Sequence, residues 1–77
     1  MKRFDLRHLK QNFTDRMAAI MDGEISGGEV AIFLFEIGDF SSVQKSADVI
    51  KAGGHELLNS LKFNEVDWTV VARKKSA

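Results

Sequence analysis

Cysteine and proline are both absent from the 77 residues of this chain. Without cysteine the chain can form no disulfide, no thiolate nucleophile and no cysteine-based zinc or iron–sulfur site. The longest apolar run covers residues 30–35, far short of the roughly 20 residues that a membrane-spanning helix needs. The first ten residues contain no apolar segment of the secretory type. We therefore expect a single domain over residues 1–77 that is cytoplasmic and does not enter a membrane.

The chain also lacks an excess of charge of either sign, because 11 Lys and Arg balance 11 Asp and Glu. A balanced chain has no global basic field, so nucleic acid is not an expected partner. Basic residues nevertheless gather near both ends, whereas residues 22–39 carry carboxylates alone. The two basic ends could form one patch if they meet, but we favour a solvated surface.

Residues 9–24, LKQNFTDRMAAIMDGE, predict an amphipathic helix with a polar start. Either Asn12 or Thr14 can cap this helix, since its side-chain oxygen can accept from a free backbone N–H. Asp15 follows in the first turn, where the helix dipole favours a negative charge. The apolar side chains recur at helical spacing, and they are Phe13, Met17, Ile20 and Met21.

The remaining chain predicts strands around one further helix. Residues 3–6 alternate polar and apolar side chains, as a short strand does. Residues 29–37 are β-branched and aromatic and are apolar on both faces, which is typical of a central strand. Residues 38–54 predict a second helix ending at two glycines. Residues 55–63 and 66–74 predict two strands joined as a hairpin.

Alternation within these segments assigns side chains to faces. In the second helix, the expected buried stripe is Val43, Ala47 and Ile50. In the first hairpin strand, the residues expected on one face are Leu57, Leu61 and Phe63.

The predicted order is β-α-β-α-β-β, an α+β fold. It makes a two-layer α/β sandwich with a four-strand mixed sheet and two helices on one face, because parallel crossovers are right-handed. The central strand would then be apolar on a face without helices. That face is either shielded by neighbours such as Phe63 and Trp68, or it is an exposed patch that binds a partner.

Few residues carry a reaction signature. His55-Glu56-Leu57-Leu58-Asn59 begins like a zinc motif, but asparagine stands where the second histidine is needed. The glycines of residues 23–28 follow a helix and precede a strand, whereas phosphate-binding loops run from strand to helix. We therefore expect no metal, no cofactor and no enzymatic activity.

Three segments resemble the TusA/SirA-type family of small sulfur carriers. GGEVAIFLF (27–35) is similar to that family's turn into its central strand, KAGGHELL (51–58) to its second helix end, and DWTVVARKK (67–75) to its closing strand. The resemblance covers essentially the whole chain and implies the same β-α-β-α-β-β fold. It implies a persulfide-carrying cysteine near residues 11–14, but Gln11-Asn12-Phe13-Thr14 stands there, so sulfur transfer is not expected.

On this basis we expect a non-catalytic domain that serves as an adaptor or protein-binding module, in a sulfur-transfer or redox context. Its partner is an unidentified protein, bound at the start of the first helix or on the open sheet face. The candidate surface residues are Arg7, Gln11, Asn12 and Thr14. Two alternatives stay open: a small-ligand or anion binder at the N-terminus of the first helix, and a homo-oligomer formed through the open sheet face.

Overall fold

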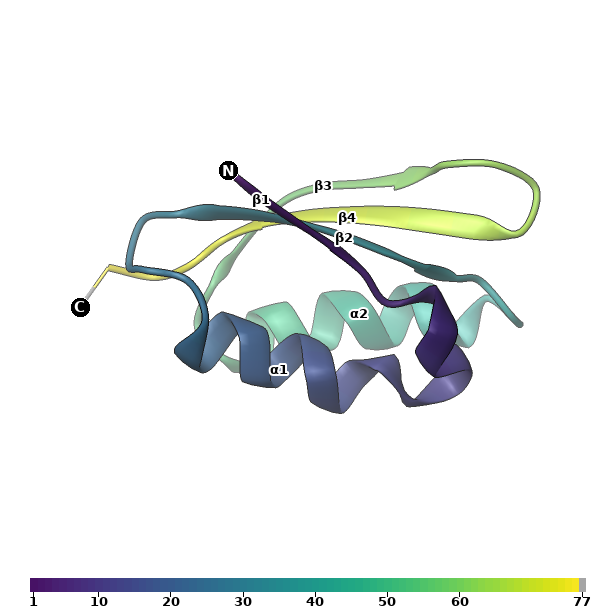
Figure 1. Cartoon of the computed structure of the whole chain (residues 1–77), viewed down its shortest axis with the longest axis horizontal. Helices are drawn as coiled ribbons and strands as arrows, with labels where there is room; N and C mark the ends of the chain where they lie inside the picture. Colours follow the sequence, from purple (N-terminus) through teal and green to yellow (C-terminus); the bar gives the residue numbers. More distant parts are fainter. Residues whose placement is uncertain (77) are drawn as a thin grey trace.

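The structure, a computed structural model, describes residues 1–76 and shows two α-helices packed on one face of a four-stranded mixed sheet (Figure 1). The strands are β1 (Lys2–Asp5), β2 (Val30–Glu36), β3 (Glu56–Lys62) and β4 (Asp67–Arg73). The helices are the 3-10 helix η1 (Arg7–Asn12), α1 (Phe13–Gly23) and α2 (Ser41–Ala52). The α+β fold and the two-layer sandwich predicted from the sequence are confirmed.

The sheet has the order β1-β2-β4-β3, so β2 and β4 form its inner pair. β1 lies parallel to β2, and the other neighbouring strands are antiparallel. Along β2 the buried residues Ala31, Phe33 and Phe35 alternate with half-buried residues such as Ile32 and Leu34. The prediction of a central strand with two apolar faces is therefore confirmed.

Aromatic stacking joins the helical layer to the sheet. Phe13, the first residue of α1, stacks on Phe35 of β2 with 4.3 Å between ring centroids and 6° between ring planes. Both side chains are fully buried. Phe4 of β1 stacks on Phe33 at 5.6 Å. Such pairs add about 0.5–1.5 kcal/mol to the stabilisation from burial alone, so the Phe13–Phe35 pair anchors the start of α1.

The buried stripe of α2 lies one position away from the predicted one. Ser42 and Ser46 are fully buried, whereas Val43 and Ala47 are half-buried. Hydrophobicity alone predicts that valine is buried in preference to serine. The hydroxyl groups of Ser42 and Ser46 can nevertheless face the core, because each of them is hydrogen-bonded. The Ser42 hydroxyl donates to Oε1 of Gln11 at 3.0 Å, and the Ser46 hydroxyl donates to the Val43 carbonyl at 2.7 Å. The predicted burial of Ile50 is correct.

A β-bulge in β3 overturns the prediction that Leu57 shares a face with Leu61 and Phe63. Leu57 pairs with Ala72 and the next paired residue, Asn59, lies opposite Val71, so Leu58 is an extra residue. One extra residue reverses the alternation beyond it. Leu57 consequently packs against the core on the helical side, while Leu61 lies on the opposite face.

The predicted side-chain cap of α1 is wrong. Neither Asn12 nor Thr14 caps the helix, because α1 continues directly from η1. A capping residue needs an extended backbone, but Asn12 has φ −97° and ψ 17°. The chain instead turns sharply at Lys10, the one non-glycine residue with positive φ (54°) among residues 1–76.

The helices of this domain are short. α2 has 12 residues, which corresponds to about 18 Å, whereas the hydrocarbon core of a bilayer is about 30 Å thick. Within residues 1–76, no helix has the length and apolar character that crossing a membrane requires.

We expect the Phe13→Ala variant to lose about 3–5 kcal/mol of unfolding free energy, because it removes one partner of the buried stack and leaves a cavity. Phe40→Ala is the matched control: Phe40 is 73% exposed, so its change should stay within about 0.5 kcal/mol. Urea unfolding followed by the fluorescence of Trp68, the single tryptophan, measures both. Equal losses in the two variants would contradict this account of the core.

Candidate functional site

The face of the sheet opposite α1 and α2 carries no helix, as Figure 1 shows. We call it the open face. Strand register places side chains with apolar groups on it from the three strands β2, β4 and β3, and they are Ile32, Leu34, Val71, Thr69 and Leu61. Phe63, directly after β3, joins this group and is 60% exposed. Of the two alternatives left open for this face, the structure favours the exposed patch: Phe63 leaves the face accessible, and Trp68 packs against the core beneath the sheet.

A hollow of about 490 Å³ lies on the open face. Charged residues of β1 stand at its edge, whereas its floor and far wall are mostly apolar. Its main lining residues are Arg3, Asp5, Ile32, Leu34, Phe63 and Thr69. Apolar surface with a polar rim is characteristic of binding sites, so this hollow is the leading candidate site.

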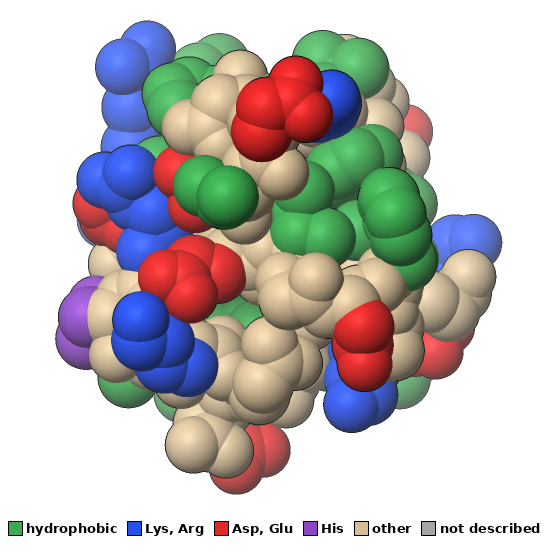
Figure 2. Space-filling view, turned by 90° about the vertical axis from the view of Figure 1, so that its right-hand side faces the viewer, with side chains coloured by type: hydrophobic (Ala, Val, Ile, Leu, Met, Phe, Trp, Pro, Cys, Tyr) green, Lys and Arg blue, Asp and Glu red, His purple; other side chains and the backbone are tan. Residues whose placement is uncertain are grey.

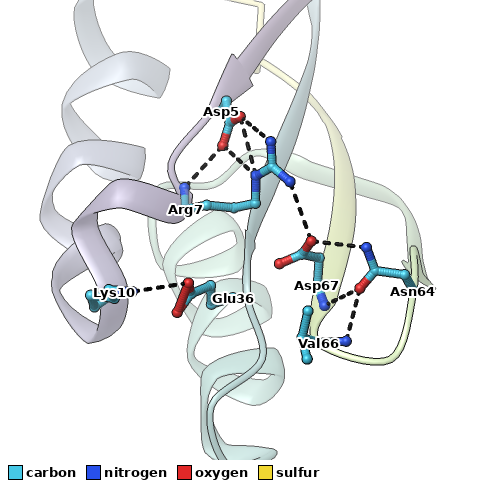
Figure 3. Close-up of polar contacts among 7 residues, drawn as sticks. All are labelled: Asp5, Arg7, Lys10, Glu36, Asn64, Val66 and Asp67. Carbon is cyan, nitrogen blue, oxygen red and sulfur yellow. Dashed lines mark hydrogen bonds and ion pairs between the residues drawn. The ribbon is translucent and has the colours of Figure 1, made fainter.

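Arg7 forms a bridge across one end of the open face (Figure 3). Its Nη2 donates to Oδ2 of Asp5 at 2.7 Å, and its Nε donates to Oδ1 at 3.0 Å. Its Nη1 donates to Oδ2 of Asp67 at 3.3 Å. Asp5 ends β1 and Asp67 begins β4, so one guanidinium ties together two strands that are separated by β2.

Asn64 completes this network at the β3–β4 turn (Figure 3). Its Nδ2 donates to Oδ2 of Asp67 at 3.0 Å, and its Oδ1 accepts the backbone N–H groups of Val66 and Asp67, each at 2.8 Å. Asp67 is only 4% exposed. A buried carboxylate needs such partners, since an unpaired one would be strongly destabilising.

The bridge shifts the ionisation of both partners. Hydrogen bonds from the Arg7 side chain and backbone lower the pKa of Asp5 from 3.8 to about 2. The Asp5 carboxylate in turn raises the pKa of Arg7. Both groups are therefore held in their charged forms at neutral pH.

The four predicted surface residues lie together, but two of them, Arg7 and Gln11, are engaged within the domain. Arg7 forms the bridge, and Oε1 of Gln11 accepts from Ser42 while its amide lies against Gly38. Asn12 is exposed and Thr14 is half-buried. The sequence indicated this region through the resemblance to a cysteine-bearing family, and it contained no signal for the Arg7–Asp67 contact across 60 positions.

Histidine and carboxylate side chains make no metal-binding group of three within residues 1–76. The His55 side chain is 2% exposed, and its Nδ1 accepts the backbone N–H of Lys75 at 3.1 Å. Its Nε2 has no hydrogen-bond partner among the described residues and lies 3.8 Å from Oδ1 of Asp22. His55 thus holds the C-terminal segment against the end of α2.

The basic residues at the two ends of the chain meet at the C-terminal end of α1. Nζ of Lys2 donates to the Glu24 carbonyl at 3.1 Å. Nζ of Lys74 donates to the carbonyls of Asp22 and Ile25, at 2.8 and 3.0 Å. These lysines satisfy carbonyls at the negative end of the helix dipole, so they have a structural role there.

A second group of exposed apolar side chains lies at the end of the molecule that holds the β3–β4 turn and the start of α2 (Figure 2). Phe40 and Val66 are 73% and 64% exposed, and with Ile37 they line a second recess, also of about 490 Å³. We call Phe40, Val66 and Ile37 the end patch. Two carboxylates, Glu36 and Glu65, also line this recess.

We expect the Arg7→Gln variant to raise the pKa of Asp5 from about 2 toward 3.8, because the donors that stabilise the carboxylate are lost. A lowered native pKa stabilises the fold above the unfolded-state pKa of about 4, and this contribution is lost as the pH falls through about 2. The variant should therefore lose less stability than the wild type between pH 4 and pH 2. Carboxyl ¹³C titration and urea unfolding measure the two effects.

Lys10→Gln is the matched control for this experiment. Lys10 pairs with Glu36 at 3.2 Å in the same region but does not contact Asp5. The titration curve of Asp5 in this variant should match that of the wild type. A similar shift in both variants would mean that general surface charge, and not the Arg7 bridge, sets the ionisation of Asp5.

Comparison with known proteins gave a family match and a structural match. The sequence profile of a family described as the putative E subunit of NADH-ubiquinone oxidoreductase matches residues 1–74. The solution structure of HP1264 from Helicobacter pylori is 56% identical in sequence and has a TM-score of 0.69, and the match covers 99% of this chain and 100% of that chain. No curated protein matches the chain.

The family match shows that the resemblance to TusA/SirA-type sulfur carriers was wrong. The three similar segments lie at turns, at a helix end and in a closing strand. Glycines at such turns and β-branched residues in such strands are typical of domains with this order of elements. These motifs therefore indicate the fold, and they do not identify the family. The profile covers nearly the whole sequence, and the protein belongs to the family described as the putative E subunit of NADH-ubiquinone oxidoreductase.

Proposed function

We propose that this chain is a non-catalytic, protein-binding subunit of an NADH–ubiquinone oxidoreductase assembly, and that it docks through its open face. The family description supplies the assembly, since it names one subunit of such an enzyme. The observation that carries the docking role is the open face itself, with its hollow of about 490 Å³ and the exposed side chains Leu61 and Phe63. An apolar surface of this kind is costly to leave in water and favours a protein partner.

The donor groups of the chain support a role without an iron–sulfur cluster. Iron–sulfur clusters are held by cysteine thiolates, and even the Rieske type needs two of them. This sequence contains no cysteine, and residues 1–76 contain no group of three metal-ligating side chains. These residues therefore do not fit an iron–sulfur cluster, and we assign electron transfer through such clusters to other subunits of the assembly.

Phosphate-binding glycine loops run from a strand into the N-terminus of a helix. The Gly27-Gly28 turn runs from the end of α1 into β2, and the nearby α1 end receives lysines on its carbonyls. Among residues 1–76, the loop from β2 into α2 contains one glycine, Gly38, but the Asp39 carboxylate there already accepts the backbone N–H of Ser41 at 3.0 Å. This helix start therefore has a negative charge where a dinucleotide phosphate would bind. We accordingly assign NADH binding to another subunit as well.

The open face suits a docking surface better than the end patch does. Its apolar residues other than Phe63 come from neighbouring strands, so their positions are fixed by backbone pairing. Phe63, directly after β3, donates its backbone N–H to the Asp67 carbonyl at 3.1 Å. Arg7 holds β1 and β4 in place at its end. A preformed surface loses little conformational entropy on binding, and this favours affinity. The end patch, by contrast, includes Phe40 and Val66, which lie outside the regular strands and helices.

The anion-binding alternative has less support. It requires free cations near the first turn of α1, but Arg7 is bound to two carboxylates and Lys10 pairs with Glu36. Asp15 in the first turn adds a further negative charge. An anion would have to displace these carboxylates before it could bind.

The test is co-purification from the cell that makes this protein. We expect the affinity-tagged protein to recover the oxidoreductase, seen as its subunits by mass spectrometry and as NADH:ubiquinone reductase activity in the eluate. Phe63→Asp should weaken this recovery by about 30-fold or more, because an aromatic anchor in an interface contributes about 2 kcal/mol or more. Binding to the purified assembly at graded concentrations measures the change.

Phe40→Asp is the matched control, since Phe40 is a similarly exposed phenylalanine outside the open face. It should bind as the wild type does. Equal loss in both variants would reject the open face as the docking surface. Wild-type protein that recovers no oxidoreductase subunit, when produced at its native level, would reject the proposed function.

A further inference from the structure

The charged side chains around the open face mostly neutralise one another. Arg7 pairs with two aspartates at one end, and Arg73 pairs with Glu56 across β3 and β4. Lys10 pairs with Glu36 at the end of β2. Each of these contacts joins a cation to a carboxylate within 4.0 Å. Three cations face four carboxylates in these contacts, so the one negative charge in excess lies on the cluster of Arg7, Asp5 and Asp67.

Arg3 is different from these residues. It lies on β1 opposite Ile32, and it lines the hollow on the open face. Within residues 1–76 its side chain takes part in no ion pair and no hydrogen bond, whereas Asp5, the other charged residue that lines this hollow, is paired with Arg7. The hollow thus combines an apolar floor with one guanidinium that makes no direct ion pair.

A partner that covers this hollow must supply a group that interacts favourably with the positive charge of Arg3. An apolar surface alone would strip water from Arg3 and leave a cation without a counter-charge, which costs free energy. A carboxylate removes this cost, because it can accept two parallel hydrogen bonds from a guanidinium. The apolar wall formed by Phe63, Ile32 and Leu34 needs an apolar side chain beside that carboxylate.

We propose that the partner subunit places an apolar side chain in the hollow and an adjacent Asp or Glu carboxylate on Arg3. This inference rests on the proposed function, because it names the chemistry of the surface that docks there. It distinguishes a different protein from a second copy of this chain. A second copy packed face to face offers Arg3 only carboxylates that already contact a cation of their own fold, and they are Asp5, Glu36, Glu56 and Asp67.

The first experiment tests the hollow in the isolated protein, without the assembly. The probes are 4-phenylbutyrate and 4-phenylbutylamine, which share a phenyl group and differ in the sign of their charge. In ¹H–¹⁵N spectra, the butyrate should shift the amides of Arg3, Ile32, Leu34 and Thr69 along a saturable curve, and it should bind at least about five times more tightly than the amine. Arg3→Glu should reverse this preference.

Lys45→Glu makes the same charge change on the exposed surface of α2, away from the open face. It should keep the butyrate preference of the wild type. An amine that binds the hollow as tightly as the butyrate, or a preference lost equally in both variants, would overturn the inference. Sedimentation that shows a dimer disrupted by Phe63→Asp would also overturn it, because the occupant would then be a second copy.

The second experiment uses the purified assembly. Arg3→Glu should weaken binding by at least about tenfold and reduce its salt dependence, whereas Arg3→Lys should weaken it less. Unchanged binding of Arg3→Glu, together with a large loss in Phe63→Asp, would overturn the inference and leave the proposed function intact. A butyrate preference in the isolated protein with no binding to the assembly would instead support the chemistry of the hollow and reject the proposed function.

Discussion

The structure depends on one constraint: β2 is apolar on both faces, but a chain of this length supplies helices for only one of them. Ala31, Phe33 and Phe35 take the covered face, where α1 and α2 complete the core. Ile32 and Leu34 remain on the other face because alternation along a strand allows no other arrangement. The open face is therefore a direct consequence of the sequence that makes β2 the centre of the sheet.

A sheet with one uncovered face needs its edges held by other means. β1 is only four residues long and lies at an edge of the sheet. Arg7 compensates for this because its guanidinium contacts the end of β1 and the start of β4. Asn64 then fixes the neighbouring turn through Asp67. Polar contacts thus hold the strands together at this end of the open face, whereas helix packing holds them together on the covered face.

Most of the fold could be predicted from the sequence because it follows from local periodicity. The order of elements, the central position of β2 and the buried face of α1 all come from patterns within about ten residues. The errors have a common origin in contacts that no local pattern contains. The bulge at Leu58 reverses a strand face, Ser42 faces the core because of Gln11, and Arg7 finds Asp67 60 positions away. The candidate site depends on these distant contacts, so the sequence indicated its location only as an open sheet face.

The absence of cysteine excludes thiolate chemistry whether the chain is compared with sulfur carriers, the family first inferred and wrong, or with oxidoreductase subunits, the family shown by the profile match. A sulfur carrier needs a thiolate to form a persulfide, and an iron–sulfur subunit needs thiolates to hold its cluster. Neither chemistry fits these 77 residues. One fold can carry different activities, so membership of a family of oxidoreductase subunits indicates a place in an assembly more reliably than it indicates a reaction. The uncovered half of β2, with Arg3 at its edge, is where this domain has apolar surface and charge that its own fold does not use.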